Sequence, residues 1–208
     1  MVFLILGLST GIISVDKDYT GHYKIGELNG KIEFTEGFNE KEWGWGWNLL
    51  LVENNFALGV KGLKGSETKE LDSLFLDLSF DTKLFELGYA SHFSRIILFL
   101  SGGGGYSSVN LKSVREDEVI DFTNSILNPE GSVTYKGSSY VLSASAGFVL
   151  AISDYLGVGA SAGYVHGLRT PEMILDGMEE VEVQNAPGMP LHQWYVKCSL
   201  GFGDFTHL

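Results

Sequence analysis

The sequence predicts an all-β chain that folds as an eight-stranded antiparallel up-and-down β-barrel and crosses a membrane. Large apolar side chains recur at every second position over long stretches, as in residues 139–167. The positions between them hold mostly Gly, Ala and Ser, and short turns alternate with long loops along the chain. Successive side chains of an extended chain point to opposite faces, so one face is apolar and the other small. A closed barrel in lipid needs this arrangement, because closure gives every backbone N–H and C=O a partner.

Length and composition narrow the class of protein. The 208 residues contain no stretch that resembles a linker, so we expect one domain over residues 1–208. The formal net charge of −12 argues against nucleic acid as a partner. The single cysteine, Cys198, excludes an intramolecular disulfide and disfavours a Cys-based zinc site. No apolar run approaches the roughly 18 residues of a membrane helix, so any membrane crossing would use strands.

The N-terminal part of the chain predicts three strands. In residues 4–15, Leu6 and Leu8 alternate with small residues. We interpret residues 1–8 as part of this strand, with the remnant of a secretion signal as the alternative. In residues 42–53, three tryptophans alternate with glycines, and the turn at 53–55 leads into a strand over 55–64.

In residues 73–91 apolar residues occupy every second position, and the alternation shifts by one residue partway along. Leu74, Leu76, Leu78 and Phe80 are predicted on the outer face, followed by Phe85, Leu87 and Tyr89. We interpret the change at 81–83 as a β-bulge in one strand. A hairpin turn there is the alternative, and together with a short hairpin at 23–36 it would give ten strands.

The remaining alternations complete a regular layout. The predicted strands are 4–15, 42–53, 55–64, 73–91, 95–111, 135–152, 155–168 and 191–205. Tight turns at 53–55, 92–94 and 153–155 alternate with longer loops at 16–41, 65–72, 112–134 and 169–190. Acidic residues gather in the last two long loops, at Glu116, Asp117, Glu118, Asp121, Glu130, Glu172, Asp176, Glu179, Glu180 and Glu182.

The stretch "LGVGASAGYVHG" and the last strand "WYVKCSLGFGDF" resemble small bacterial outer-membrane β-barrel proteins, the OmpA-like and opacity-type porin group. The resemblance covers nearly the whole chain and implies a monomer in a bacterial outer membrane. It also implies contact with the lipid bilayer, with lipopolysaccharide and with the barrel-assembly machinery, which recognises an aromatic residue ending the last strand. Here residues 206–208 follow Phe205.

Two sets of residues are candidates for the functional site. Aromatic side chains near the long-loop ends of the strands are expected at the lipid headgroup level: Trp43, Trp45, Trp47, Tyr140, Tyr164 and Trp194. In the alternative, these aromatic residues form the core of a soluble protein, but the sequence contains no clear amphipathic helix to cover them.

The second set is the charges predicted to point into the lumen: Lys61, Asp77, Glu86 and Lys197. Lys61 and Glu86 each lie six residues from a tight turn on neighbouring strands, so we expect them to meet. An ion pair would offset part of the cost of burying both charges. We therefore expect a plugged interior, with a narrow conducting pore as the alternative.

No motif in the sequence indicates catalysis, a cofactor or a metal. The run "SGGGGYSS" lacks the Gly-Lys-Ser/Thr of a phosphate loop, and the five histidines lack metal-ligand spacing, although His166 and His192 are expected near each other. We expect a non-enzymatic barrel with a structural, surface-presenting or adhesive role and acidic extracellular loops that bind a ligand. The alternatives are a channel for small solutes, a soluble barrel that binds an apolar ligand, and an outer-membrane enzyme.

Overall fold

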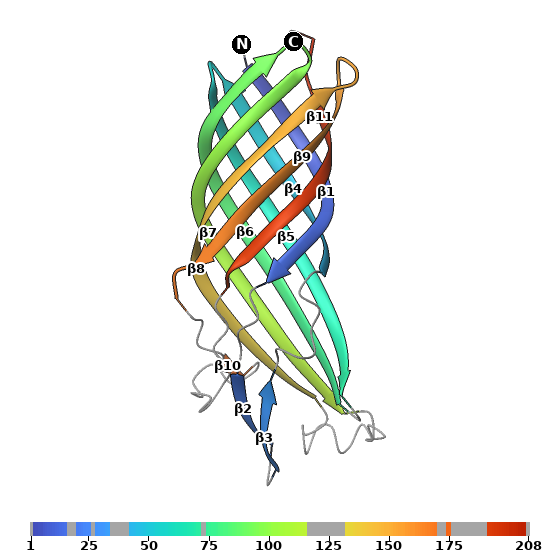
Figure 1. Ribbon diagram of the computed structural model, residues 1–208, viewed down its shortest axis with the longest axis vertical. Coiled ribbons are helices and arrows are strands. Elements are labelled where there is room, and N and C mark those ends of the chain that lie inside the picture. The colour runs from blue at the N-terminus through green and yellow to red at the C-terminus, as the bar shows by residue number, and fades with distance from the viewer. Residues whose placement is uncertain are drawn as a thin grey trace.

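Eight antiparallel strands form a closed barrel in the computed structural model (Figure 1). The structure describes residues 2–15, 20–25, 28–33, 42–71, 74–115, 132–169, 174–175 and 191–206. The barrel strands are β1 (Val2–Val15), β4 (Glu42–Glu53), β5 (Phe56–Leu71), β6 (Leu74–Phe93), β7 (Ile96–Arg115), β8 (Ser132–Ala151), β9 (Leu156–Gly167) and β11 (Gln193–Gly203). Each pairs with the next barrel strand along the chain, and β1 closes the barrel on β11. The predicted eight-stranded up-and-down barrel is confirmed.

The ten-strand alternative is wrong. β2 (Thr20–Ile25) and β3 (Leu28–Glu33) pair only with each other, as a separate two-stranded sheet. β10 (Ile174–Leu175) adds two residues beside β8. The acidic loop residues at 116–130 and 172–182 lie outside the described residues, as does every side chain in 170–190.

The predicted β-bulge at 81–83 is also wrong. β6 pairs with β5 and with β7 in one unbroken register through these residues. Even-numbered side chains of β6 point inward along its described length, so Leu78 and Phe80 are buried rather than on the outer face as predicted. The side chains of Leu74 and Leu76 lie outside the described residues.

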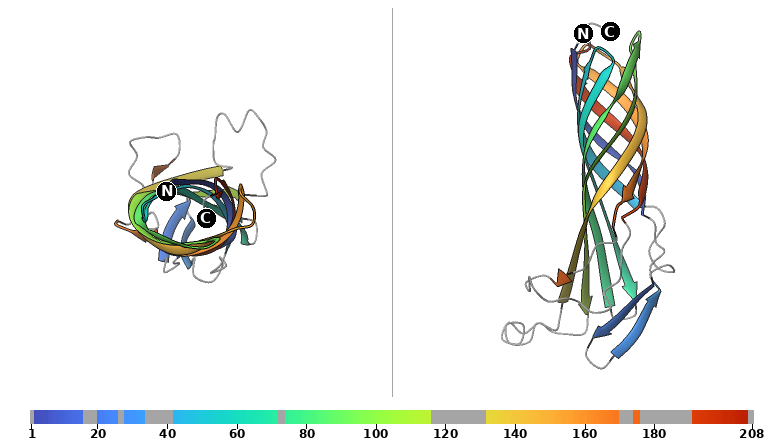
Figure 2. Two further views of the ribbon diagram at one scale, coloured as in Figure 1. Left: turned by 90° about the horizontal axis from the view of Figure 1, so that it is seen from above. Right: turned by 90° about the vertical axis from the view of Figure 1, so that its left-hand side faces the viewer.

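The wrong assignment of faces on β6 is explained by the length of four strands. β5 to β8 continue past the ends of β1, β4, β9 and β11 and form a curved extension of the barrel wall (Figures 1 and 2). In this extension the outer face carries exposed polar residues such as Thr68 and Asp77, and the inner face buries Leu78, Phe80 and Val109. The apolar side therefore changes from outside to inside where the wall leaves the apolar zone.

The short-turn end of the barrel holds three tight connections and both chain termini (Figure 1). Asn54 and Asn55 have φ of 46° and 72°, as the two central residues of a type I′ hairpin turn require. Ser94 has φ of 54° at the first central position of the β6–β7 turn. Left-handed conformations are common for Asn and uncommon for most other non-glycine residues. A two-residue turn of defined conformation fixes the register of its hairpin, so these turns set the pairing of β4 with β5 and of β6 with β7. The opposite end, where the predicted long loops leave the strands, is called here the long-loop end.

Inward glycines let backbone and side chains approach closely inside the barrel. A Cβ added at Gly103 of β7 would collide with the carbonyl oxygen of Phe85 on β6. A Cβ at Gly163 of β9 would overlap the ring of Tyr195 on β11. The small inward face is therefore a steric requirement at these positions.

The inward side chains form three layers. Along β6 they read Ala90, Glu86 and Leu84 from the short-turn end, and β1 gives Ile5, Ser9 and Ile13 in the same order. The first apolar layer consists of Ile5, Leu50, Val52, Ala57, Ala90, Ile97, Val149, Ala151 and Phe205. A polar layer follows, and then a mixed layer in which Ile13, Leu63, Leu84, Val141, Val165 and Leu191 lie beside the buried polar side chains of Thr82, Ser107 and Gln193. No helix in the described part of the chain is long and apolar enough to span a membrane.

Candidate functional site

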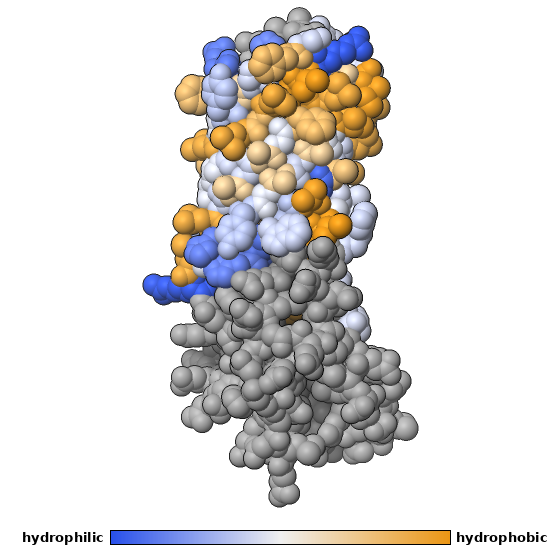
Figure 3. All heavy atoms as spheres, viewed as in Figure 1, coloured by the Kyte–Doolittle hydropathy of each residue, from blue (hydrophilic) through white to orange (hydrophobic). Residues whose placement is uncertain are grey.

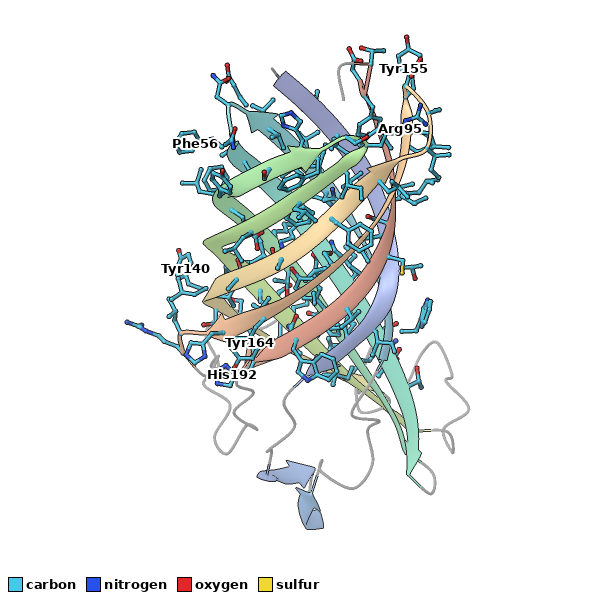
Figure 4. The ribbon with its side chains drawn as sticks, turned by 45° about the horizontal axis from the view of Figure 1, so that its top comes forward. Phe56, Arg95, Tyr140, Tyr155, Tyr164 and His192 are labelled. Carbon is cyan, nitrogen blue, oxygen red and sulfur yellow. The ribbon has the colours of Figure 1, made fainter. Side chains whose placement is uncertain are left out.

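The six aromatic residues predicted for the lipid interface are all exposed on the outer face, with Trp43 and Tyr140 more than 70% accessible. Pairing places them beside one another: Trp194 lies directly opposite Tyr164, and Tyr140 lies opposite Tyr106 with ring centroids 6.1 Å apart. In Figure 4, Tyr140 and Tyr164 lie toward the long-loop end. They form one edge of an apolar zone.

A second group of exposed aromatics, which the sequence analysis did not assign to a lipid interface, lies toward the short turns: Phe56, Tyr89, Phe93, Tyr155 and Phe202. Figure 4 shows Phe56 and Tyr155 at the end opposite Tyr140 and Tyr164. Trp194 and Phe202 lie eight residues apart on β11. At ~3.3 Å per residue and a tilt of ~40°, the two aromatic groups are about 20 Å apart along the barrel axis.

Between the two aromatic groups, exposed leucines and other apolar side chains cover the outer face, among them Leu6, Leu8, Leu49, Leu58, Leu87, Leu100, Leu142, Val196 and Leu200. We call this surface and its aromatic edges the outer belt. Figure 3 shows hydrophobic side chains gathered on this part of the surface. A soluble barrel for an apolar ligand would place such side chains inside, whereas an apolar band of about 25 Å is typical of outer-membrane barrels.

The polar layer is built around a buried ion pair. Lys61 of β5 and Glu86 of β6 are both buried, and their Nζ and Oε1 atoms are 2.7 Å apart. Glu86 also accepts hydrogen bonds from three serine hydroxyls: from Ser143 at 2.8 Å on Oε1, and from Ser101 at 2.6 Å and Ser145 at 3.0 Å on Oε2. Each carboxylate oxygen therefore has two donors.

Lys61 has equally complete partners. Besides Glu86, its ammonium donates to Ser145 Oγ at 2.9 Å and to the Tyr195 hydroxyl at 2.6 Å. Its three N–H donors are thus all used. The sequence analysis did not single out the serines or Tyr195, although all occupy inward positions in the same alternation that placed Lys61 and Glu86.

The other two predicted lumen charges differ from each other. Lys197 of β11 points inward and is buried, and its Nζ has no hydrogen-bond partner among the described residues. Asp77 is not a lumen charge, because it lies exposed on the outer face of the extension, where it accepts a 2.6 Å hydrogen bond from Thr68. The prediction failed because it assumed that the apolar face of β6 points outward along the whole strand.

A cavity of about 50 Å³ lies in the polar layer. Lys197, Ser161 and Ser199 line it from one side, and Asn48, Lys61 and Glu86 line it from another, with Phe99, Leu50 and Val149 toward the first apolar layer. Ser161 lies directly opposite Lys197 in the β9–β11 register. The cavity is thus a partly open space in the polar layer, with both polar and apolar side chains in its lining.

The two histidines expected to approach each other do so. The rings of His166 and His192 stack with centroids 4.4 Å apart, and the backbone N–H of Gly167 donates to His192 Nδ1 at 3.2 Å. Among the residues that the structure describes, no group of three or more His, Cys, Asp or Glu is placed to hold a metal ion.

Comparison with protein-family models gives no match, and comparison with curated protein sequences gives none either. Solved structures do match over nearly the whole chain. A major outer membrane protein from Thermus thermophilus is similar with a TM-score of 0.62 at 7% identity, covering 97% of this chain and 98% of that one. Neisserial surface protein A gives a TM-score of 0.56 at 9% identity, with coverages of 97% and 96%.

The outer membrane protease OmpT from Escherichia coli gives a TM-score of 0.50 at 8% identity, covering 97% of this chain and 96% of that one. At these identities the comparisons establish the fold. The neighbours include a protease beside proteins with other names, so the fold alone assigns no activity. The closed eight-stranded architecture, the outer belt and these neighbours together make the chain a β-barrel of the bacterial outer-membrane type.

Proposed function

We propose that the protein is a non-conducting barrel in a bacterial outer membrane that anchors its long loops at the cell surface, in a structural or adhesive role. The observation that carries the proposal is the interior. A saturated Lys61–Glu86 network lies between the first apolar layer, in which Phe205 packs at the short-turn end, and the mixed layer. We infer that this stack leaves no continuous water path, because ions cross packed, largely apolar layers only at a large cost.

The long loops are proposed to do the binding. Loop 169–190 carries five acidic residues against Arg169, and loop 112–134 carries five against Lys112 and Arg115. Their negative charge favours cationic partners, including divalent ions that bridge lipopolysaccharide phosphates. The long-loop end also bears the wall extension of β5 to β8, which would hold its loops well above the lipid headgroups.

Planar-bilayer recording tests the plugged interior. The purified protein, reconstituted alongside a general porin as positive control, should give no conductance steps in chloride or potassium salts of different ionic strength. Reproducible steps from the protein alone would instead support the second candidate, a narrow channel, for which the 50 Å³ polar cavity is the observation in favour.

Loop replacement tests surface presentation. Neutralising the five acidic residues of loop 169–190 to Asn and Gln should reduce binding of calcium or of cationic surfaces to whole cells. The barrel should still show the mobility shift on boiling in SDS. If the variant loses both the binding and the mobility shift, the loops act on assembly rather than on a partner.

A non-enzymatic role is part of the proposal. We infer that substrates do not reach the buried ionisable side chains of the polar layer, because packed side chains lie on both sides of it. Purified protein should release no products from peptides, phospholipid or lipid A. Turnover that persists after further purification and disappears on unfolding would contradict this.

A further inference from the structure

The buried ionisable side chains that the structure describes inside the barrel do not balance in charge type. They are Lys61, Glu86 and Lys197, two basic groups and one acidic group. Glu86 neutralises Lys61 at 2.7 Å, and both of its oxygens already accept two hydrogen bonds each. The ammonium of Lys197 is left without a hydrogen-bond acceptor in the described part of the chain, although the residue is only 7% exposed. A charged group buried in this way strongly destabilises the folded state unless a partner is supplied.

The surroundings of Lys197 offer space for such a partner. Lys197 lines the 50 Å³ cavity, and since a water-sized particle needs about 10–15 Å³ of such space, the cavity holds a few of them. The centroid of the Tyr195 ring lies 5.2 Å from Lys61 Nζ and 5.6 Å from Lys197 Nζ. The Tyr195 hydroxyl accepts a hydrogen bond from Lys61, so it is already used by that lysine.

The other polar side chains that line the cavity carry hydrogen-bond donors, from which an anion can accept. Ser161 and Ser199 contribute hydroxyls, and Asn48 contributes a side-chain amide. The one carboxylate in the lining, Glu86, is saturated by Lys61 and three serines. An ammonium without an acceptor, beside hydroxyl-bearing side chains in a small cavity, is suited to a compact anion.

We propose that this cavity binds a small monovalent anion of halide size, such as chloride, held by Lys197 with Ser161, Ser199 and Asn48. The anion supplies the negative charge that the described side chains of the polar layer lack. Bulky organic anions do not fit the volume. The proposal depends on the barrel fold and not on the proposed function of the loops.

Refolding in different salts tests the site. The protein is refolded into detergent in sodium chloride, sodium bromide or sodium gluconate at equal ionic strength, and its thermal unfolding is measured in each. The Tm of the wild type should rise with chloride and bromide concentration relative to gluconate, because binding to the folded state alone stabilises it. Lys197→Met should lose this dependence, and the control Lys83→Met, at an exposed outer position, should keep it.

A second variant keeps the proposal testable if Lys197→Met does not fold. Ser161→Asp places a carboxylate opposite Lys197, so it should remove the halide dependence while retaining the stability of the barrel in gluconate. Crystals grown in sodium bromide should show one anomalous peak in the cavity, lost in Lys197→Met or Ser161→Asp. Equal halide dependence in all variants, or bromide-grown crystals with no peak beside Lys197, would overturn the proposal.

Discussion

Replacing Glu86 by Leu should destabilise the barrel more than replacing its partner Lys61 by Met, although both changes break the same ion pair. Glu86→Leu leaves Lys61 and Lys197 with no carboxylate among the described side chains of the lumen. It also leaves the hydroxyls of Ser101, Ser143 and Ser145 without the carboxylate that they contact. Lys61→Met leaves Glu86 and Lys197, which line the same cavity and carry opposite charges.

The magnitudes follow from the cost of an uncompensated buried charge. Removing one partner of a buried pair costs about 3–5 kcal/mol, and we expect Glu86→Leu to fall at or above the upper end of that range. Lys61→Met should cost less, because Lys197 partly compensates Glu86. The double variant, with both members apolar, should be more stable than Glu86→Leu alone, since replacing a whole buried pair by apolar groups is often close to neutral.

Equilibrium unfolding in urea, followed by tryptophan fluorescence of refolded protein in lipid vesicles, measures these free energies. The matched control is Lys64–Asp81, a second ion pair between β5 and β6, with N–O distance 3.2 Å and a lysine side chain that is 48% exposed. Its double-mutant cycle should give a coupling of about 0.2–1 kcal/mol. Equal losses for Glu86→Leu and Lys61→Met, with additive effects in the double variant, would refute the reasoning.

Three further predictions concern packing and the outer belt. Gly103→Ala should prevent stable folding because its Cβ would meet the Phe85 backbone, whereas Gly59→Ala, whose nearest neighbours lie at 3.7 Å, should unfold in urea like the wild type. Phe205→Ala should lose about 3–5 kcal/mol in the same assay, because the ring packs in the first apolar layer, and Phe202→Ala, at a 50% exposed outer position, should lose less. Leu49→Arg, on the outer face midway between the aromatic groups, should cost about 2–4 kcal/mol in vesicles, and an effect equal to that of Leu49→Ala would contradict a lipid-facing position.

Much of the barrel could be predicted from the sequence because its alternation has a period of two residues over long strands. Each of the eight strands lies within a few residues of its expected bounds, apart from the longer ends of β5, β7 and β8. The alternation also identified which residues share a face, so Lys61, Glu86 and Lys197 were placed inside from their position in the pattern alone.

The errors arose where hydrophobicity no longer marks the outer face. Beyond the outer belt the wall of β5 to β8 is polar outside and apolar inside, so Leu78 and Phe80 were assigned to the wrong face and Asp77 to the lumen. The apparent break at 81–83 reflects that exchange of environment and not a change in backbone pairing. Alternating hydrophobicity shows which side chains avoid water. It identifies the outward face of a strand only where the surroundings of the barrel, lipid or water, are known.

The polar layer was only partly accessible to sequence reasoning. Pairing between neighbouring strands brought Lys61 and Glu86 together, but contacts across the lumen, such as that of Lys61 with Tyr195, depend on how far the strands stagger around the barrel. Phe205 follows the last strand by two residues and turns into the interior, held by its backbone hydrogen bond to Asp154. Neither contact follows from the alternation of a single strand.

Spin-label accessibility along β8 tests most directly the central claim that the outer belt faces lipid. In a Cys198→Ala background, single cysteines at positions 140 to 150 would carry a nitroxide, with the refolded protein in lipid vesicles. We predict a period of two residues: high collision rates with oxygen at the even positions, which face outward, and low rates at the odd positions, which face the lumen. Accessibility to a water-soluble relaxant should stay low at the even positions in the middle of the strand. High accessibility to that relaxant at the even positions, or no alternation at all, would contradict the account.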